Sequence, residues 1–252
     1  MDQIEGRNPV IEALRAGREI NKLLVARGSK AGSMKEILAL ARSASVPVQE
    51  VDREKLDGMA ASRAHQGVIA LAASKEYASV EDMLALASER SEDPLLLILD
   101  GIEDPQNLGS LLRTADAAGV HGVIIPQHRA AGLTATVAKA SAGAIEYVPV
   151  ARVVNLSRTI DELKGKGLWV AGSDASGEQA HFSADLKGPL AIVVGSEGNG
   201  IGRLVREKCD FLVQLPMRGR VSSLNAAVAG AILLYEALRQ RMANGVHRQP
   251  KG

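Results

Sequence analysis

The sequence predicts an α/β protein whose larger part is built on a parallel sheet. Short apolar runs alternate along the chain with segments in which apolar residues recur at helical spacing. The run at 95–99, LLLIL, lacks the polar alternation of a half-exposed strand, which indicates a strand buried on both faces. Polar loops follow several of these runs, and ligands bind at that edge of open parallel sheets.

Composition is that of a soluble globular protein of the cytoplasm. Apolar residues make up 46% of the 252 residues, and no apolar run approaches the length that spans a bilayer. Asp2 and Glu5 lie where an export signal needs positive charge, so we expect no export. A single cysteine, Cys209, excludes an internal disulfide and fits a reducing compartment. We expect this thiol to fill core space rather than to act as a nucleophile.

The formal net charge is only +1, but it is unevenly distributed. Residues 1–75 carry 12 Lys/Arg against 9 Asp/Glu, residues 76–93 carry 1 against 6, and residues 94–252 carry 17 against 14. Two mildly basic parts therefore flank an acidic segment, which is compatible with a nucleic-acid partner. Aromatic residues make up 2% of the chain, which argues against a base-stacking platform.

Residues 1–73 predict a small α/β domain. Asn8 and Pro9 have the types preferred at an N-cap and at the first helical position, so a helix is expected from there to residue 16. Further helices are expected at 33–43 and 53–60, and strands at 22–28, 46–51 and 65–73. Residues 74–93 follow as an acidic linker that contains a short helix capped by Ser79.

The second domain spans 94–252 and continues the alternation. Strands are expected at 95–100, 120–126, 147–150, 168–173, 189–195 and 211–215, and helices at 108–118, 134–142 and 156–164. After the last strand, Ser222 and Ser223 stand where an N-cap is expected before an alanine-rich helix. Apolar residues recur along this helix at steps of three and four, which predicts one continuous apolar face. Its members are Leu224, Val228, Ile232, Tyr235 and Leu238.

Three polar loops each follow a buried strand of this domain. They comprise residues 101–107, 195–202 and 215–225, the last with Arg218 and Arg220. The glycines of GSEGNG fall as G-x-x-G-x-G and not as the G-x-G-x-x-G phosphate fingerprint, and no Walker lysine is present. A nucleotide-phosphate site of either kind is therefore disfavoured.

The three loops together resemble the motifs of the SpoU (TrmH-like) family of RNA ribose 2′-O-methyltransferases, in the SPOUT superfamily. The pattern N-x-G-x-x-x-R-T-x-x-x-x-G matches from Asn107 to Gly119, and G-x-E-G matches from Gly195 to Gly198. The third motif, P-M-x-G-x-V-x-S-L-N, matches residues 216–225. The segments NPVIEAL and HQG of the first domain are similar to the substrate-binding domain of the family's ribosomal-RNA members.

The resemblance implies a fold, a cofactor and an assembly. The second domain is expected to contain a deep trefoil knot, a rare exception among protein folds. S-adenosylmethionine is expected as the methyl donor, cradled by backbone around Gly195, Leu215, Met217 and Leu224. The active unit is expected to be a homodimer, in which Arg113 reaches RNA near the partner's cofactor.

The reaction that the resemblance implies requires a ribose 2′-hydroxyl to lose a proton, and the candidate catalytic residues are Asn107, Arg113, Glu197, Ser223 and Asn225. A guanidinium holds its proton far above neutral pH, so Arg113 is not expected to be a free base. We expect it to fix a phosphate and to stabilise the developing alkoxide. Glu197 either takes the proton or orders its loop. Asn107, Ser223 and Asn225 are expected to hold loops and cofactor in place.

Several readings of the target stay open. The chain is most similar to members that methylate a guanosine of large-subunit (23S) ribosomal RNA, but a transfer RNA or an antibiotic-resistance site on ribosomal RNA is an alternative. A non-catalytic RNA-binding protein that keeps the fold is another, and the intact motif residues argue against it. The five histidines are scattered without ligand spacing, so we expect no metal, and no membrane partner is expected.

Overall fold

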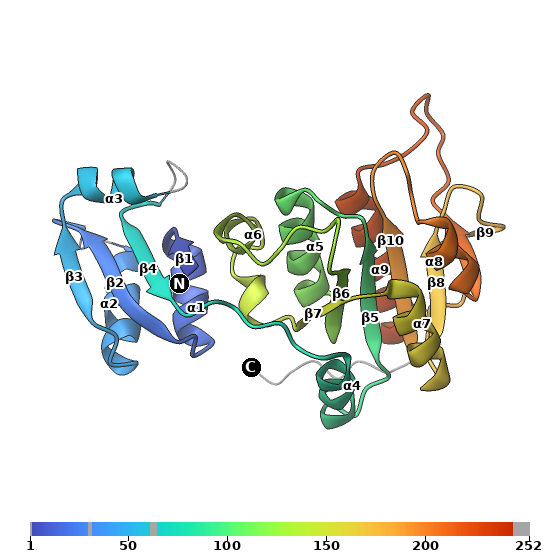
Figure 1. Cartoon of the computed structure of the whole chain (residues 1–252), viewed down its shortest axis with the longest axis horizontal. Coiled ribbons are helices and arrows are strands. Elements are labelled where there is room, and N and C mark those ends of the chain that lie inside the picture. Colours follow the sequence, from blue (N-terminus) through green and yellow to red (C-terminus); the bar gives the residue numbers. More distant parts are fainter. Residues whose placement is uncertain (1, 30–31, 61–64, 244–252) are drawn as a thin grey trace. The chain divides into compact units, whose positions relative to one another are not determined.

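A computed structural model describes residues 2–29, 32–60 and 65–243 of the chain. The chain forms two compact units (Figure 1). The first contains the residues up to Glu76 together with Gly132–Tyr147, and the second contains Tyr77–Ala131 and the residues from Val148 onward. The division predicted from sequence, 1–73, 74–93 and 94–252, follows chain order alone, whereas these contacts place residues 132–147 with the N-terminal unit.

The described residues of the first unit form a four-stranded sheet with the order β1-β4-β2-β3. Its elements are β1 (Asp2–Glu5), α1 (Arg7–Arg15), β2 (Ile20–Ala26), α2 (Ser33–Ser43), β3 (Val48–Val51), α3 (Arg53–Met59) and β4 (Val68–Ala72). The prediction missed β1 because this short segment is mostly polar and becomes a strand only by pairing with β4. Helix α2 has the bounds predicted for it. The predicted cap at Asn8 is wrong, because Gly6, at a φ of 94°, turns the chain out of β1 and α1 begins at Arg7.

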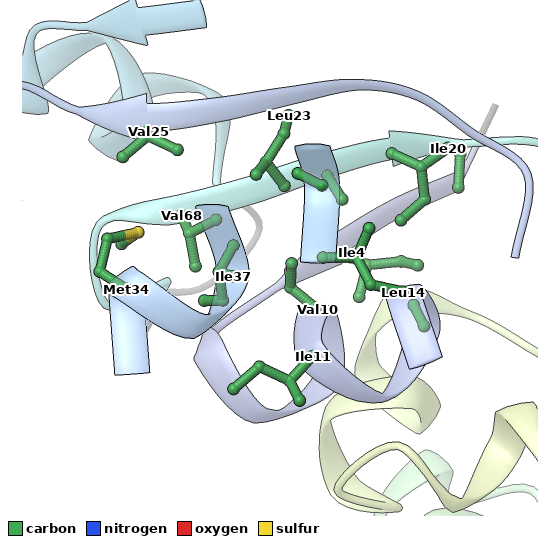
Figure 2. Close-up of a cluster of buried hydrophobic side chains, with 14 residues drawn as sticks. Ile4, Val10, Ile11, Leu14, Ile20, Leu23, Val25, Met34, Ile37 and Val68 are labelled. Atoms are coloured by element: carbon green, nitrogen blue, oxygen red, sulfur yellow. The ribbon is translucent and has the colours of Figure 1, made fainter. Parts of the chain in front are cut away.

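One face of this sheet and two helices enclose the core of the first unit (Figure 2). Ile4 of β1, Val10 and Leu14 of α1, and Met34 and Ile37 of α2 are all buried there. They pack against the strand side chains of β2 and β4. The helical spacing that the sequence shows in both helices therefore corresponds to real core faces.

Residues 132–147 complete the first unit with α6 (Ala135–Ala140) and the short 3-10 helix η1 (Ala144–Glu146). The carboxylate of Glu146 has 3% of its side chain exposed and accepts hydrogen bonds from Arg18 Nη1 at 3.1 and 3.0 Å and from Lys75 Nζ at 3.3 Å. The hydroxyl of Tyr147 donates to Glu12 at 2.6 Å. These contacts join a segment from the middle of the sequence to the N-terminal residues. The strand expected at 147–150 begins only at Val150, because the turn that follows η1 takes up residues 147–149.

In the second unit, the described strands form a seven-stranded sheet with the order β7-β6-β5-β10-β8-β11-β9, in which every neighbouring pair is parallel. Its elements are α4 (Val80–Glu89), β5 (Leu95–Asp100), α5 (Pro105–Ala117), β6 (Gly122–Pro126), β7 (Val150–Val153), α7 (Leu156–Gly165), β8 (Trp169–Ser173), β9 (Gln179–Ala180), β10 (Leu190–Gly195), α8 (Arg203–Lys208), β11 (Phe211–Gln214) and α9 (Ala226–Ala243). This is the parallel α/β architecture that the sequence predicts.

Helix α4 lies within the segment predicted to be an acidic linker. The predicted cap at Ser79 is confirmed, because its hydroxyl accepts from Asp82 N and the Asp82 carboxylate accepts in turn from Ser79 N. Met83 of α4 is fully buried in a cluster with strand residues of the second unit. A Cβ on Gly122 would lie 2.2 Å from the Met83 sulfur, so this glycine allows the close packing of α4 on β6.

Because the strands are parallel, their carboxyl ends all lie along one side of the sheet, which we call the carboxyl edge. Their amino ends lie along the opposite side, the amino edge. The carboxyl edge carries the loops at 101–104, 127–131, 196–202 and 215–225, which follow β5, β6, β10 and β11. At the opposite, amino edge lies Arg241, which is 3% exposed near the end of α9. Its guanidinium donates to the carbonyl oxygens of Asp93 at 2.8 Å, Pro94 at 3.1 Å and Gly188.

His121, also at the amino edge, is fully buried. Its Nδ1 accepts from Leu95 N at 3.0 Å, so the proton of a neutral ring lies on Nε2, 3.1 Å from Glu92 Oε2. Burial lowers the pKa of His121 below its usual value, although the Glu92 carboxylate opposes this. A second proton on Nδ1 would also meet the Leu95 N–H, so the geometry favours the neutral ring.

Helix α9 differs from its prediction in both its start and its buried face. It begins at Ala226, and the side chain of Asn225 accepts from Ala227 N at 3.0 Å and Val228 N at 3.2 Å, so the predicted cap at Ser222 and Ser223 is wrong. The predicted apolar face is not the buried one, since Val228 and Tyr235 are 48% and 51% exposed. The buried residues are Ala226, Ala227, Gly230, Leu233, Leu234, Ala237 and Arg241.

The reason is the contact between α9 and α5. A Cβ on Gly230 would lie 2.5 Å from Leu111 of α5, so the small residues of α9 admit this neighbour closely. The trefoil knot expected at this end of the chain stays a prediction. None of the helices in the described ranges is long and apolar enough to cross a membrane.

Candidate functional site

The first motif lies mostly on helix α5 rather than in a loop. Helix α5 begins at Pro105, three residues before its predicted start, because Asp104 Oδ1 accepts from Gln106 N at 2.9 Å and caps it. Asn107 therefore stands in the first helical turn, at the carboxyl edge. Arg113 stands further along the same helix, exposed.

The second motif is a tight turn after β10. Ser196 and Gly200 exchange two backbone hydrogen bonds, at 3.1 and 2.9 Å. A Cβ on Gly195 would lie 2.0 Å from the Gly200 backbone, so only glycine fits there. Asp100 at the end of β5 accepts from Gly202 N at 2.7 Å, which ties this turn to the neighbouring strand.

The three motifs meet at one carboxylate oxygen. Glu197 Oε1 accepts from Asn107 Nδ2 at 3.1 Å, from Asn225 Nδ2, and from Ala226 N at 3.3 Å. Asn225 Nδ2 also donates to Asn107 Oδ1 at 2.9 Å. We refer to these residues as the Asn107–Glu197–Asn225 cluster. It joins segments that are 90 and 28 residues apart in the sequence, and its charged acceptor makes these hydrogen bonds strong.

A cavity of about 430 Å3 opens beside this cluster. Its wall includes six of the predicted site residues: Gly195, Glu197, Leu215, Met217, Ser223 and Leu224. Apolar side chains and backbone thus face the cavity from the loops after β10 and β11. Such a mixture of apolar surface and a few polar groups is typical of small-molecule sites.

Three predicted residues do not line the cavity. Asn107 and Asn225 instead donate hydrogen bonds to Glu197, which does line it. The side chain of Arg113 forms neither a hydrogen bond nor an ion pair with any other residue that the structure describes. The structure therefore brings eight of the nine predicted residues together and leaves Arg113 apart on the exposed side of α5.

Sequence reasoning missed the loop after β8, which also lines the cavity at residues 173–175. Asp174 Oδ1 accepts from Ser176 N at 2.8 Å and from its hydroxyl at 2.7 Å. Although burial disfavours the charged form, the hydrogen bonds from Ser176 and the nearby Arg206 hold the pKa of Asp174 below its usual value. The signal that could have identified this loop is its position at the carboxyl end of β8, the strand next to β10.

Cys209 takes no part in this site. Burial, with the nearby Asp210 carboxylate, raises the pKa of its thiol to about 12, so the sulfur is protonated at neutral pH. A protonated thiol is a poor nucleophile. Its packing beside the core of the second unit agrees with the expectation that it fills space.

The fold and the cavity define an α/β protein with a small-molecule site at the carboxyl edge of a parallel sheet. The model of the SpoU rRNA Methylase family matches residues 94–235, and a model for RNA 2'-O ribose methyltransferase substrate binding matches residues 3–78. The chain therefore belongs to the SpoU rRNA Methylase family.

Individual relatives cover nearly the whole chain. YacO of Bacillus subtilis, assigned to the TrmH family of tRNA/rRNA methyltransferases, is 52% identical over 240 residues, which is 95% of this chain and 96% of that protein. The crystal structure of the SpoU methyltransferase AviRb from Streptomyces viridochromogenes in complex with AdoMet superposes with a TM-score of 0.81 at 27% identity, over 96% of this chain and 90% of the other. A crystal structure of an RNA 2'-O ribose methyltransferase superposes with a TM-score of 0.78 at 31% identity, over 95% of this chain and 88% of the other.

Proposed function

We propose that this protein transfers a methyl group from S-adenosylmethionine to a ribose 2′-hydroxyl of RNA. The observation that carries the proposal is the convergence of three motif segments on Glu197, beside a cavity at the carboxyl edge. AviRb, which has the same fold, was crystallised with AdoMet. Bound there, the cofactor supplies an electrophilic methyl group on a positively charged sulfur.

The cavity fits such a cofactor. Its volume lies within the range of roughly 300–1,000 Å3 that small-molecule sites occupy. Leu215, Met217 and Leu224 supply apolar surface for a ring system, and exposed backbone of the turn after β10 offers hydrogen-bonding groups. The carboxylates of Asp174 and Glu197 lie in the wall, where they favour a ligand with positive charge.

In this proposal Glu197 organises the site rather than accepting the substrate proton. Its Oε1 already accepts three N–H groups, which come from Asn107 of the first motif and from Asn225 and Ala226 at the end of the third. Glu197 therefore holds the three motif segments together. Asn107 and Asn225 act through Glu197, and Asn225 in addition caps helix α9. Ser223, which lines the cavity, is proposed to hold the cofactor or the adjacent loop.

We assign Arg113 to the RNA and to the developing negative charge on the 2′-oxygen. A guanidinium provides paired donors in one plane, which suits a phosphate oxygen and an alkoxide together. Arg113 does not line the cavity of its own chain, so a second copy is needed to bring the two together. The exposed apolar side chains Val228 and Tyr235 on α9, beside α5, support a homodimer formed through this face.

The RNA target is proposed to be large-subunit ribosomal RNA, and a guanosine within it. The match of residues 3–78 to a substrate-binding model supports an RNA-contacting role for the N-terminal unit. A transfer RNA is the second candidate, because the assignment of YacO includes both kinds of RNA. A cytoplasmic location stays a prediction from the sequence.

Two measurements test the proposal. Calorimetry with S-adenosylmethionine should give one site per chain, and transfer of labelled methyl groups should occur to ribosomal RNA in preference to transfer RNA. Mass-spectrometric mapping of 2′-O-methyl groups in cells with and without the protein then identifies the nucleotide. Cofactor binding without methyl transfer to either RNA would contradict the proposed reaction.

A further inference from the structure

Exposed arginines of the second unit differ in whether their guanidinium groups have a partner. Some are paired on their own helices, such as Arg158 with Glu162, Arg203 with Glu207 and Arg239 with Glu236. Others have side chains without a hydrogen-bond or ion-pair partner among the described residues, namely Arg90, Arg113, Arg129, Arg218 and Arg220. Arg129, Arg218 and Arg220 lie in loops of the carboxyl edge, the edge that also carries the cavity.

Arg129 belongs to none of the three motifs, and its loop is firmly held at both ends. At the beginning of the loop, Gln127 N donates to Val153 O at 2.8 Å and Gln127 O accepts from Arg152 Nη2 at 2.7 Å. At its end, Ala131 N donates to Ile102 O at 2.8 Å, which joins the loop to the one that leads into α5. Arg129 is exposed between these anchors, and Glu103 in the neighbouring loop does not pair with it.

The backbone of Arg129 is in the left-handed region, at a φ of 54°. Ser45, Ser91 and Ala142 adopt this conformation directly after the last turn of a helix, where it is common, and Gln66 adopts it in the turn before β4. Arg129 instead follows a strand, and for a residue with a Cβ the left-handed region costs free energy. Strained backbone of this kind is concentrated at binding and catalytic sites.

We propose that Arg129 binds a phosphate of the RNA strand whose ribose is methylated, which rests on the proposed function. In the sheet order β6-β5-β10-β8-β11, Arg129 follows β6 and Arg218 and Arg220 follow β11, so the loops around the cavity lie between them. Four strand spacings separate β6 from β11, or about 19 Å. At a rise of roughly 3.4 Å or more per nucleotide, a single strand of several nucleotides spans this distance.

The chemistry of the site suits a phosphate rather than a base. A guanidinium binds phosphate through two parallel hydrogen bonds, and Arg129 has all its donors free within the described structure. The anchored loop fixes the backbone that carries Arg129 before the RNA arrives, which reduces the entropy lost on binding. Arg129 is thus a positioning residue for the substrate, whereas Arg113 is assigned to the reacting atoms.

The variant Arg129→Gly separates this role from a structural one. Glycine adopts the left-handed conformation freely, so the variant removes the guanidinium and relieves the backbone. We expect its melting temperature to be equal to or above that of the unaltered protein. Its affinity for large-subunit ribosomal RNA transcribed in vitro should fall about threefold to tenfold, and the slope of log K against log salt should decrease by about 1. Cofactor affinity, and kcat at saturating RNA, should stay within about twofold, with the loss appearing in KM.

Arg90→Ala is the matched control. Arg90 lies at the end of α4, just before the amino edge, and its exposed side chain lacks a partner among the described residues. The Arg90→Ala variant removes the same unit of charge as Arg129→Gly, and it should leave the RNA affinity and the salt slope unchanged. Arg129→Lys keeps the charge and should retain the salt slope while recovering only part of the affinity.

Equal effects of Arg129→Gly and Arg90→Ala would overturn the inference, because net charge alone would then explain them. Unchanged RNA affinity in Arg129→Gly would overturn it as well, while the proposed function would stand. Failure of the unaltered protein to bind or methylate RNA would instead overturn the proposed function, and this inference with it.

Discussion

The two edges of the seven-stranded sheet use the same kind of side chain in opposite ways. At the amino edge, Arg241 is buried and donates to three backbone carbonyl groups, and His121 has both ring nitrogens engaged. At the carboxyl edge, Arg129, Arg218 and Arg220 are exposed and have no partner among the described residues. The two terminal nitrogens of the Arg241 guanidinium are used within the fold, while its Nε has no acceptor among the described residues. The guanidinium groups of Arg129, Arg218 and Arg220 are left available for a ligand. Stability and binding are therefore assigned to opposite ends of the same strands.

We therefore expect substitutions at the two edges to affect different properties of the protein. A change at the amino edge should lower the free energy of unfolding and leave the chemistry nearly intact. A change among the exposed arginines, or in the cluster beside the cavity, should alter turnover or affinity with little loss of stability. The following predictions test this separation.

The largest expected effect is that of Arg113→Lys on turnover. Lysine keeps the charge but lacks the paired planar donors that hold a phosphate oxygen and the 2′-oxygen together. We expect turnover to fall by about two orders of magnitude or more, as when one preorganised transition-state donor is lost. Single-turnover methylation with saturating RNA measures this, alongside a cofactor titration that should change by no more than a few fold. Near-normal turnover would reduce Arg113 to a phosphate anchor.

Arg241→Met should affect stability instead. The variant leaves carbonyl groups of Asp93, Pro94 and Gly188 buried without their donor, which costs about 2 kcal/mol of the free energy of unfolding. The melting temperature should fall by about 4–8 °C, measured by calorimetry, with turnover at 25 °C within about twofold.

The matched control for this change is Arg239→Met on the same helix. The side chain of Arg239 is 63% exposed, and its partner Glu236 keeps a second donor, Gln240 Nε2 at 2.8 Å, when Arg239 is replaced. We therefore expect a smaller loss of stability than for Arg241→Met. If the two variants have the same melting temperature, the buried arginine does not hold the amino edge together as we infer.

Glu197→Gln and Glu197→Ala distinguish a proton acceptor from an organiser. Glutamine keeps an acceptor oxygen for the N–H groups of the cluster, so turnover should fall less than about tenfold. Alanine removes the acceptor, and we expect cofactor affinity to fall by about tenfold, measured by calorimetry. A fall in turnover of several hundredfold in the glutamine variant, with normal cofactor affinity, would identify Glu197 as the base.

The smallest expected effect concerns pH. The folded-state pKa of His121 is lowered by burial, so between its folded and unfolded values the unfolded chain binds more protons. Its contribution to stability is therefore complete above the unfolded pKa near 6.5, and it is lost as the pH falls below that value. Melting temperatures between pH 7.5 and 5.5 should fall more steeply for the unaltered protein than for His121→Asn. Identical pH profiles would show that His121 does not contribute.

Local patterns in the sequence predicted elements well where neighbours in the chain decide the structure. The buried run LLLIL became β5, α2 kept its predicted bounds, and Ser79 caps α4 through its own first turn. Each depends on hydrophobic spacing or on a hydrogen bond between residues close in sequence. The motif residues could likewise be assigned to loops at strand ends, where parallel topology places them at one edge.

The missed features depend on contacts between distant segments. The apolar face predicted for α9 is exposed, because Gly230 and the alanines admit α5 on the other side. Asn225 could not be recognised as a cap until its partner Glu197 fixed where the loop ends. Neither Arg241 nor Arg129 carries a local signal, since burial of the first and strain at the second arise from the tertiary fold.

The return of residues 132–147 to the N-terminal unit has a consequence for synthesis. The ribosome releases the residues up to Glu76 first, but Glu146, the partner of Arg18 and Lys75, follows 70 residues later. At about 5–20 residues per second, the N-terminal unit waits several seconds for this last part of its own structure. During that interval Arg18 and Lys75 lack their buried acceptor, and strands β5 and β6 of the other unit emerge in between. The first unit is therefore completed only after synthesis of the second has begun, and the two units have overlapping rather than successive folding times.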